Sequence, residues 1–195
     1  MCLLVLLAGA GVPSSARGES PAAQIEIPNF GKVNEHLYRG AQPDEKQYAA
    51  LAALGIGTII DLRDDARPWA RRSAERAGIR YVNLRLSSVV PPTSEEGAYF
   101  LQLVKDSVDG PVFVHCAGGR HRTGVLVALY RMVVDGWTAE RAYEEMKQYK
   151  FYSALGHGRM KDYVFDSYRA LVESAAHAAG SAAPALARGG GGQQD

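Results

Sequence analysis

The sequence predicts an α/β fold in which a central, mainly parallel sheet is flanked by helices. Short β-branched runs alternate along the chain with longer segments whose apolar residues recur at helical spacing. Strands that alternate with helices in this way pair in parallel and are covered on both faces. The chain has 195 residues, of which 47% are hydrophobic and 22% charged, as expected of one globular domain with terminal extensions.

Each element has its own start and stop signals. Gly55 and Gly78 end two helices, and a capping box that begins at Thr93 opens a third. The helices are expected at residues 44–54, 68–77, 93–108, 123–135, 137–149 and 160–172. The strands, or extended segments, are expected at residues 37–39, 58–62, 80–84 and 111–115. Pro91 and Pro92 exclude a helix from the loop at 87–92.

The domain itself is expected to span residues 24–174, between two segments of different composition. Residues 1–23 contain an apolar run, from Cys2 to Val12, that is too short to cross a bilayer and is followed by small residues. This pattern is typical of a signal peptide without its basic start, so we expect a periplasmic or secreted protein. A disordered leader would instead leave it in the cytoplasm. Residues 175–195 are rich in Ala and Gly, and we expect a disordered tail.

Net charge and cysteine content exclude several classes of protein. Lys and Arg number 22 against 21 Asp and Glu, and a net charge of +1 gives no long-range attraction to nucleic acid or an anionic membrane. Two cysteines, Cys2 and Cys116, exclude a disulfide framework and a cysteine-rich zinc module. We therefore expect no nucleic-acid partner and no membrane span, and the sequence indicates no oligomeric state.

The strongest chemical signal lies where the strand at 111–115 enters a loop that reads Cys-Ala-Gly-Gly-Arg-His-Arg over residues 116–122. Gly118 and Gly119 permit the positive φ values with which successive N–H groups can turn inward. The helix that follows adds positive charge at its N-terminus. Such a loop fits a tetrahedral dianion, and Arg122 can hold two of its oxygens in a fork.

Cys116 is the candidate nucleophile of this loop. A thiol at a helix N-terminus beside arginine has a lowered pKa and is a thiolate at neutral pH. A thiolate beneath a bound phosphate is placed for in-line attack on phosphorus, and the guanidinium of Arg122 suits the charge of the transition state. The hydroxyl of Thr123 can donate to the sulfur when the thiolate is expelled in the second step.

The loop resembles the signature of cysteine-dependent protein tyrosine and dual-specificity phosphatases, at His115, Cys116, Gly119, Arg122 and Thr123. Segments 37–43, 59–63 and 136–137 are similar to small bacterial tyrosine phosphatases. The stretch 119–124 is also similar to a plant and fungal atypical dual-specificity group that cleaves inositol pyrophosphates.

The resemblance implies a dual-specificity-phosphatase-like fold, a phosphocysteine intermediate on Cys116, and no metal or other cofactor. The implied substrate is a phosphorylated protein, most favourably at phosphotyrosine and with phosphoserine and phosphothreonine as further possibilities, or a small phosphate ester. Arg122 would bind the phosphate. The cradle would consist of the backbone N–H groups of Ala117, Gly118, Gly119, Arg120, His121 and Arg122.

The general acid is not evident in the sequence. The family usually places an Asp on the loop that here spans residues 85–94, and this loop has none. Glu95 and Glu96 are the nearest carboxylates, although helix capping also accounts for them. His121 is the other candidate, with a reference pKa of ~6.5, and its alternative role is to add positive charge. A third alternative is that no acid is essential, because phenols, with a pKa near ~10, and phosphoanhydrides leave readily.

Two other function classes remain open at this stage. The absent Asp is compatible with a non-catalytic phosphate-binding protein. A rhodanese-type enzyme is disfavoured, because its loop usually places the arginine one residue nearer the cysteine. Arg39, Arg63 and Arg85, near the ends of strands or extended segments, are candidates for a basic rim that holds a second phosphate; scattered surface ion pairs are the alternative.

Overall fold

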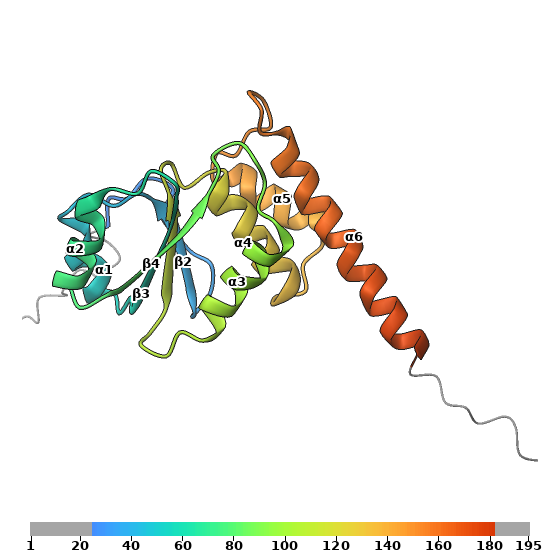
Figure 1. Ribbon diagram of the computed structural model, residues 1–195, viewed down its shortest axis with the longest axis horizontal. Coiled ribbons are helices and arrows are strands. Elements are labelled where there is room, and N and C mark those ends of the chain that lie inside the picture. The colour runs from blue at the N-terminus through green and yellow to red at the C-terminus, as the bar shows by residue number, and fades with distance from the viewer. Residues whose placement is uncertain (1–24, 182–195) are drawn as a thin grey trace, which may run out of the picture.

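The computed structural model describes residues 25–181 and shows one five-stranded sheet between two layers of helices (Figure 1). The strand order is β1-β2-β5-β3-β4, in which β1 runs antiparallel to β2 and all other neighbours are parallel. The strands are β1 (Gly31–Lys32), β2 (Leu37–Ala41), β3 (Thr58–Arg63), β4 (Arg80–Leu86) and β5 (Val112–Cys116). The predicted α/β fold with a mainly parallel sheet is confirmed.

The helices divide between the two faces of the sheet. One face is covered by α1 (Gln47–Ala53) and α2 (Pro68–Arg76). The other is covered by α3 (Ser94–Lys105), α4 (Arg122–Val133), α5 (Ala139–Gln148) and α6 (Gly158–Ser181), as Figure 1 shows. Because successive strand residues point to opposite faces, each central strand contributes to both apolar cores. Ile59 and Phe113 pack toward α1 and α2, and Ile60 and Val114 pack toward α4.

Register brings the carboxyl ends of three strands together at one edge of the sheet. Strand β5 is central, with Cys116 opposite Ala41 of β2 and His115 opposite Asp61 of β3. The loops that leave these strands therefore meet at one place, as expected for a parallel sheet. The strands that flank β5 thus position the loop that follows Cys116.

Several boundaries differ from those predicted. Helix α6 continues to Ser181, so the first part of the tail that we expected to be disordered is helical. Alanine is the strongest helix former and can extend a helix without burying any surface, and residues 172–178 are exposed. Strand β4 extends to Leu86 because it pairs with β3, and the short strand β1 was not predicted. The predicted leader, residues 1–23, lies outside the described residues, as do residues 182–195.

No helix within residues 25–181 has the length and apolar character needed to cross a membrane. Within the same residues, no group of three or more His, Cys, Asp or Glu side chains is arranged to hold a metal ion.

Candidate active site

The loop at residues 116–122 joins the central strand β5 to the buried helix α4. Cys116 is the last residue of β5, and Arg122 is the first residue of α4. Both side chains are buried, with 4% and 7% of their surface exposed. The loop is therefore fixed at both ends by the most buried elements of the fold.

Gly119 allows the loop to adopt its shape. Its φ is +65°, and a Cβ at this position would lie 2.4 Å from the carbonyl carbon of Gly40 in β2. Gly118 has no positive φ. A Cβ there would lie 3.6 Å from the side chain of Arg120, which is an ordinary van der Waals distance. Of the two glycines that the sequence singles out, Gly119 is the one that the backbone conformation requires.

Three hydrogen bonds from outside the loop hold its carbonyl groups. The Arg39 guanidinium donates through Nη2 to the Gly119 carbonyl at 2.9 Å, and Asn29 Nδ2 donates to the Gly118 carbonyl at 2.7 Å. The backbone N–H of Gln42 donates to the carbonyl of Ala117 at 3.3 Å. These bonds turn the carbonyl groups of the loop towards neighbouring segments. They therefore support a cradle in which the N–H groups of the loop face a bound anion.

Arg39 does not lie on the rim, where the sequence suggested it for a second phosphate. It is fully buried beneath the loop, and its guanidinium stacks on the ring of Tyr149 at 3.8 Å. Burial lowers the pKa of Arg39 to about 10, so it stays charged at neutral pH. Its role is to support the cradle through the bond to Gly119.

The surroundings of Cys116 favour the thiolate. Burial opposes ionisation and is the largest single influence on its pKa, but hydrogen bonds from Thr123 and Gly119 and the charge of Arg122 together outweigh it and lower the pKa. The Thr123 hydroxyl oxygen is buried with no other hydrogen-bond partner among the described residues, so its proton is free for the sulfur. This arrangement supports the roles predicted for Cys116 and Thr123.

The guanidinium of Arg122 is held through one of its nitrogen atoms, Nη1. Its Nη1 donates to Asp64 Oδ1 at 2.9 Å and to the carbonyl groups of Leu86 and Leu62 at 3.1 and 3.4 Å. The bonds that it makes with the described residues all use Nη1, which leaves Nη2 and Nε for two oxygens of an anion. Asp64 was missed by the sequence reasoning, although its place just after β3 at the carboxyl edge of the sheet was a usable signal.

A pocket of about 180 Å³ lies over the thiol. It brings together most of the predicted site residues, and adds three that the sequence reasoning missed: Ser88, Tyr152 and His157. The predicted residues that line it are Cys116, Ala117, Gly118, Arg120, His121 and Arg122. Arg63 and Arg85 are not among the lining residues: Arg63 pairs with Asp65, and Arg85 donates to the carbonyl of Asp64.

None of the carboxylates predicted as general acids lines this pocket. Glu96 closes the predicted capping box, accepting from the N–H of Thr93 at 2.8 Å, and Glu95 is exposed in the first turn of α3. His121 does line the pocket, stacked on His157 with ring centroids 3.6 Å apart. Burial, followed by the proximity of His157, lowers the pKa of His121 to about 4, so the ring is uncharged at neutral pH.

His115 lies behind the loop and is fully buried. Burial lowers the pKa of its imidazole, so the ring is neutral, and Nδ1 lies 3.4 Å from the carbonyl oxygen of Cys116. The Asp61 carboxylate, 3.8 Å from Nδ1, accepts a hydrogen bond from the Tyr81 hydroxyl at 2.6 Å. These contacts support a role for His115 in holding the backbone at Cys116.

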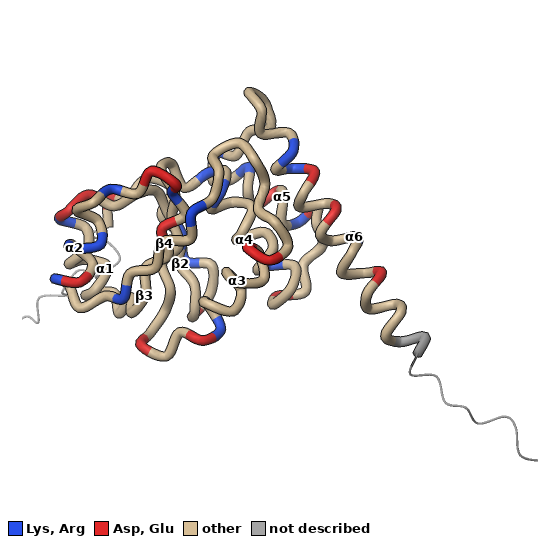
Figure 2. The backbone as a smooth tube through the Cα atoms, in the orientation of Figure 1, with Lys and Arg blue, Asp and Glu red and all other residues tan. Residues whose placement is uncertain are grey.

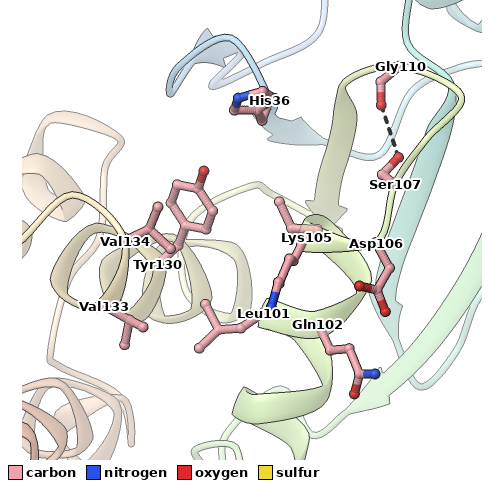
Figure 3. Close-up of a pocket in the computed structure, with 11 residues that line it drawn as sticks. His36, Leu101, Gln102, Lys105, Asp106, Ser107, Gly110, Tyr130, Val133 and Val134 are labelled. Atoms are coloured by element: carbon pink, nitrogen blue, oxygen red, sulfur yellow. Dashed lines mark hydrogen bonds between the residues drawn. The ribbon is translucent and has the colours of Figure 1, made fainter.

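A larger cavity, of about 740 Å³, lies at the opposite, amino-terminal edge of the parallel strands (Figure 3). Its lining is largely apolar, with Leu101 on α3 and Tyr130 and Val133 on α4, and Lys105 and His36 line it as well. It contains neither a cysteine nor an arginine. The residues suited to phosphate chemistry lie in the smaller pocket.

Comparison with known proteins points to one family. A family model described as "DSP-PTPase phosphatase fused to NAD+ Kinase" matches residues 22–162. The dual specificity protein phosphatase TpbA of Pseudomonas aeruginosa (strain UCBPP-PA14) is 35% identical over 138 residues, which cover 69% of this chain and 62% of TpbA. The chain therefore spans less than two thirds of that relative. The inositol diphosphatase DSP4 of Arabidopsis thaliana is 27% identical over 147 residues, covering 71% of this chain and 74% of that protein.

Solved structures show the same architecture. A crystal structure of P. aeruginosa TpbA, with a cysteine replaced by serine and phosphotyrosine bound, matches with a TM-score of 0.63 and 26% identity, covering 83% of this chain and 97% of that one. The core catalytic domain of the PP-IP phosphatase SIW14 from S. cerevisiae, in complex with citrate, matches with a TM-score of 0.66 and 20% identity, covering 80% and 95%. The second likeness is one of fold alone.

Proposed function

This chain belongs to the DSP-PTPase family of cysteine phosphatases, and from that premise we propose that it hydrolyses phosphotyrosine in proteins through a phosphocysteine intermediate on Cys116. The observation that carries the proposal is a buried thiol of lowered pKa at the base of a small pocket, beside an arginine with two free nitrogen atoms. A nucleophile and an anion holder at this spacing suit a phosphate monoester.

In the first step, the thiolate of Cys116 attacks phosphorus as the bond from phosphorus to the tyrosine oxygen breaks. Nη2 and Nε of Arg122 and the N–H groups of the cradle hold the equatorial oxygens, where charge is spread in the transition state. The phenolate leaves and takes a proton from water or from a pocket group.

In the second step, water attacks the phosphocysteine and loses a proton, the bond from phosphorus to sulfur breaks, and inorganic phosphate is released. The hydroxyl of Thr123 donates to the departing sulfur, and the same contact lowers the pKa of the Cys116 thiol in the free enzyme. The leaving thiolate is therefore stabilised without a further proton donor.

The choice of phosphotyrosine rests on the leaving group. The residues that line the pocket include no carboxylate, and His121 is uncharged at neutral pH. A phenol, with a pKa near ~10, leaves far more easily than an alkyl alcohol under these conditions. A phosphoanhydride leaves readily too, which keeps an inositol pyrophosphate as the second candidate, in line with the similarity to a plant inositol diphosphatase.

The test is phosphate release from phosphotyrosine peptides and an aryl phosphate, with and without vanadate, by the wild type and by Cys116→Ser. We expect vanadate-sensitive release that is lost in the variant. Binding without release would indicate a phosphate-binding protein, and thiosulfate sulfurtransferase activity alone would indicate a rhodanese-type enzyme. Either result would refute the proposal, as would release from inositol pyrophosphates alone.

A further inference from the structure

Two loops border the mouth of the active-site pocket. Residues 87–93 connect β4 to α3 and contribute Ser88 to the lining, and residues 149–157 connect α5 to α6 and contribute Tyr152 and His157. Because Ser88 lines the same pocket as Tyr152 and His157, the two loops face each other across its mouth. Figure 1 shows both at the end of the molecule where the parallel strands terminate.

The two loops contain few charged residues, and Lys150 of the second loop is the exception. Residues 87–93 read Ser-Ser-Val-Val-Pro-Pro-Thr and residues 151–157 read Phe-Tyr-Ser-Ala-Leu-Gly-His, without Lys, Arg, Asp or Glu. Lys150 lies at the start of the second loop, and Arg159 lies just beyond its end. Figure 2 shows these segments as tan tube, with blue tube beside the second one at the start of α6. The arginines that line the pocket are Arg120 and Arg122, both within the cradle loop. Within residues 87–93 and 149–157, Lys150 is the only Lys or Arg.

Large apolar side chains are exposed on both loops instead. Val89 and Val90 are 49% and 46% exposed, Tyr152 is 40% exposed, and Leu155 is 84% exposed. We refer to these four residues as the apolar rim. Exposed apolar groups that cluster around a pocket mark a binding surface more often than scattered ones do.

Local hydrogen bonds hold the two valines of the apolar rim in place. The hydroxyl oxygen of Ser87 accepts from the N–H groups of Val89 and Val90 at 3.3 and 3.1 Å, which fixes the turn that carries the two valines. Leu155 adopts a φ of +55°, in the left-handed region that costs an L-residue free energy. A leucine that is both strained and exposed is unfavourable for folding alone, which points to a role in contact with a ligand.

We propose, on the basis of the proposed function, that the apolar rim binds uncharged apolar side chains on either side of the phosphotyrosine in an exposed segment of the substrate protein. The enzyme then selects phosphotyrosine flanked by Leu, Ile or Val over phosphotyrosine flanked by Asp or Glu.

The test compares kcat/KM for two phosphotyrosine peptides of equal length, one with Leu and Ile on both sides of the phosphotyrosine and one with Asp and Glu. Burial of one or two apolar side chains predicts a preference of about tenfold for the apolar peptide. The double variant Val90→Ser/Leu155→Ser should reduce this preference to within about threefold. Its rate on a small aryl phosphate should not change, because neither residue lines the pocket.

Val172→Ser is the matched control. Val172 is 51% exposed, much as the valines of the rim are, but it lies on α6, outside both loops. It should leave the peptide preference as in the wild type. Equal kcat/KM for the two peptides, or a preference that the double variant retains, would refute the proposed role of the apolar rim. Neither result would bear on the phosphatase activity itself. Absence of Cys116-dependent release from every phosphotyrosine compound would instead refute the proposed function.

Discussion

Gly119 offers the sharpest test of how the cradle is built. A Cβ at this position would lie 2.4 Å from the carbonyl carbon, 2.5 Å from the carbonyl oxygen of Gly40 and 2.6 Å from the N of Ala41, all backbone atoms of β2. Because β2 is paired with the central strand β5, it cannot move aside without breaking that pairing. In Gly119→Ala the cradle must therefore shift away from the sheet.

Two costs contribute to the expected loss of stability. An alanine at φ +65° costs about 1 kcal/mol, and the overlap with backbone adds about 1–3 kcal/mol, as in other overpacked sites. For a domain of this size the sum corresponds to a fall in Tm of roughly 5–15 °C. A cradle displaced by up to about 1 Å misplaces the donors around the phosphate, and kcat/KM should fall by about 100-fold or more.

The assay is kcat/KM on an aryl phosphate, together with a thermal melt of each purified variant. Gly78→Ala is the control for backbone strain, because Gly78 has a φ of +75° but a Cβ there would have no neighbouring atom within 4 Å. This control should cost about 1 kcal/mol and leave activity unchanged. If Gly119→Ala has the same Tm as Gly78→Ala and retains the wild-type kcat/KM, the close approach to β2 does not shape the cradle.

Four further predictions follow from the same contacts. Arg39→Lys removes the planar fork beneath the cradle and should lower kcat/KM about tenfold or more with the fold intact by circular dichroism. Asp64→Asn should lower kcat/KM about fivefold, because Arg122 loses its ion pair with the carboxylate, and an unchanged value would show that the backbone carbonyls suffice. Thr123→Val should raise the pKa of Cys116 and so move the acidic limb of the profile of kcat/KM against pH to higher pH. A shift to lower pH would contradict the hydrogen bond from Thr123 to the sulfur. Across aryl phosphates, rates should fall steeply as the pKa of the leaving phenol rises, and a flat dependence would reveal a general acid.

The fold and the reactive centre were predictable because their signals are local. The strand that ends at Cys116, the glycines of the loop and the apolar helix after it are contiguous in sequence, and each carries a periodicity or a turn signal. Neighbouring β-branched strands with helices between them leave few alternatives to a parallel sheet. The central place of β5 and the position of the site at its carboxyl end follow from that topology.

The supporting residues were not predictable in the same way, because their roles depend on contacts between distant segments. Asn29 and Arg39 bond to carbonyl groups that lie 89 and 80 positions further along the chain. Tyr152 and His157 reach the pocket because α5 and α6 pack beside α4, which no local pattern specifies. Arg39 was expected at the surface because arginine usually is, yet its charge is buried where it bonds to Gly119.

The residues that line the pocket, which include no carboxylate, and the apolar rim around it favour the same substrate. Without a carboxylate among the lining residues, the first step depends on a leaving group that needs little help, and phenols and phosphoanhydrides both meet this condition. The apolar rim favours the phenol, because a tyrosine in a protein is flanked by side chains that can be apolar, whereas a polyphosphorylated ring carries no apolar side chain. Val89, Val90 and Leu155 provide apolar contacts and no charge. Chemistry at the thiol and recognition at the apolar rim favour an aryl phosphate in a polypeptide only when they are taken together.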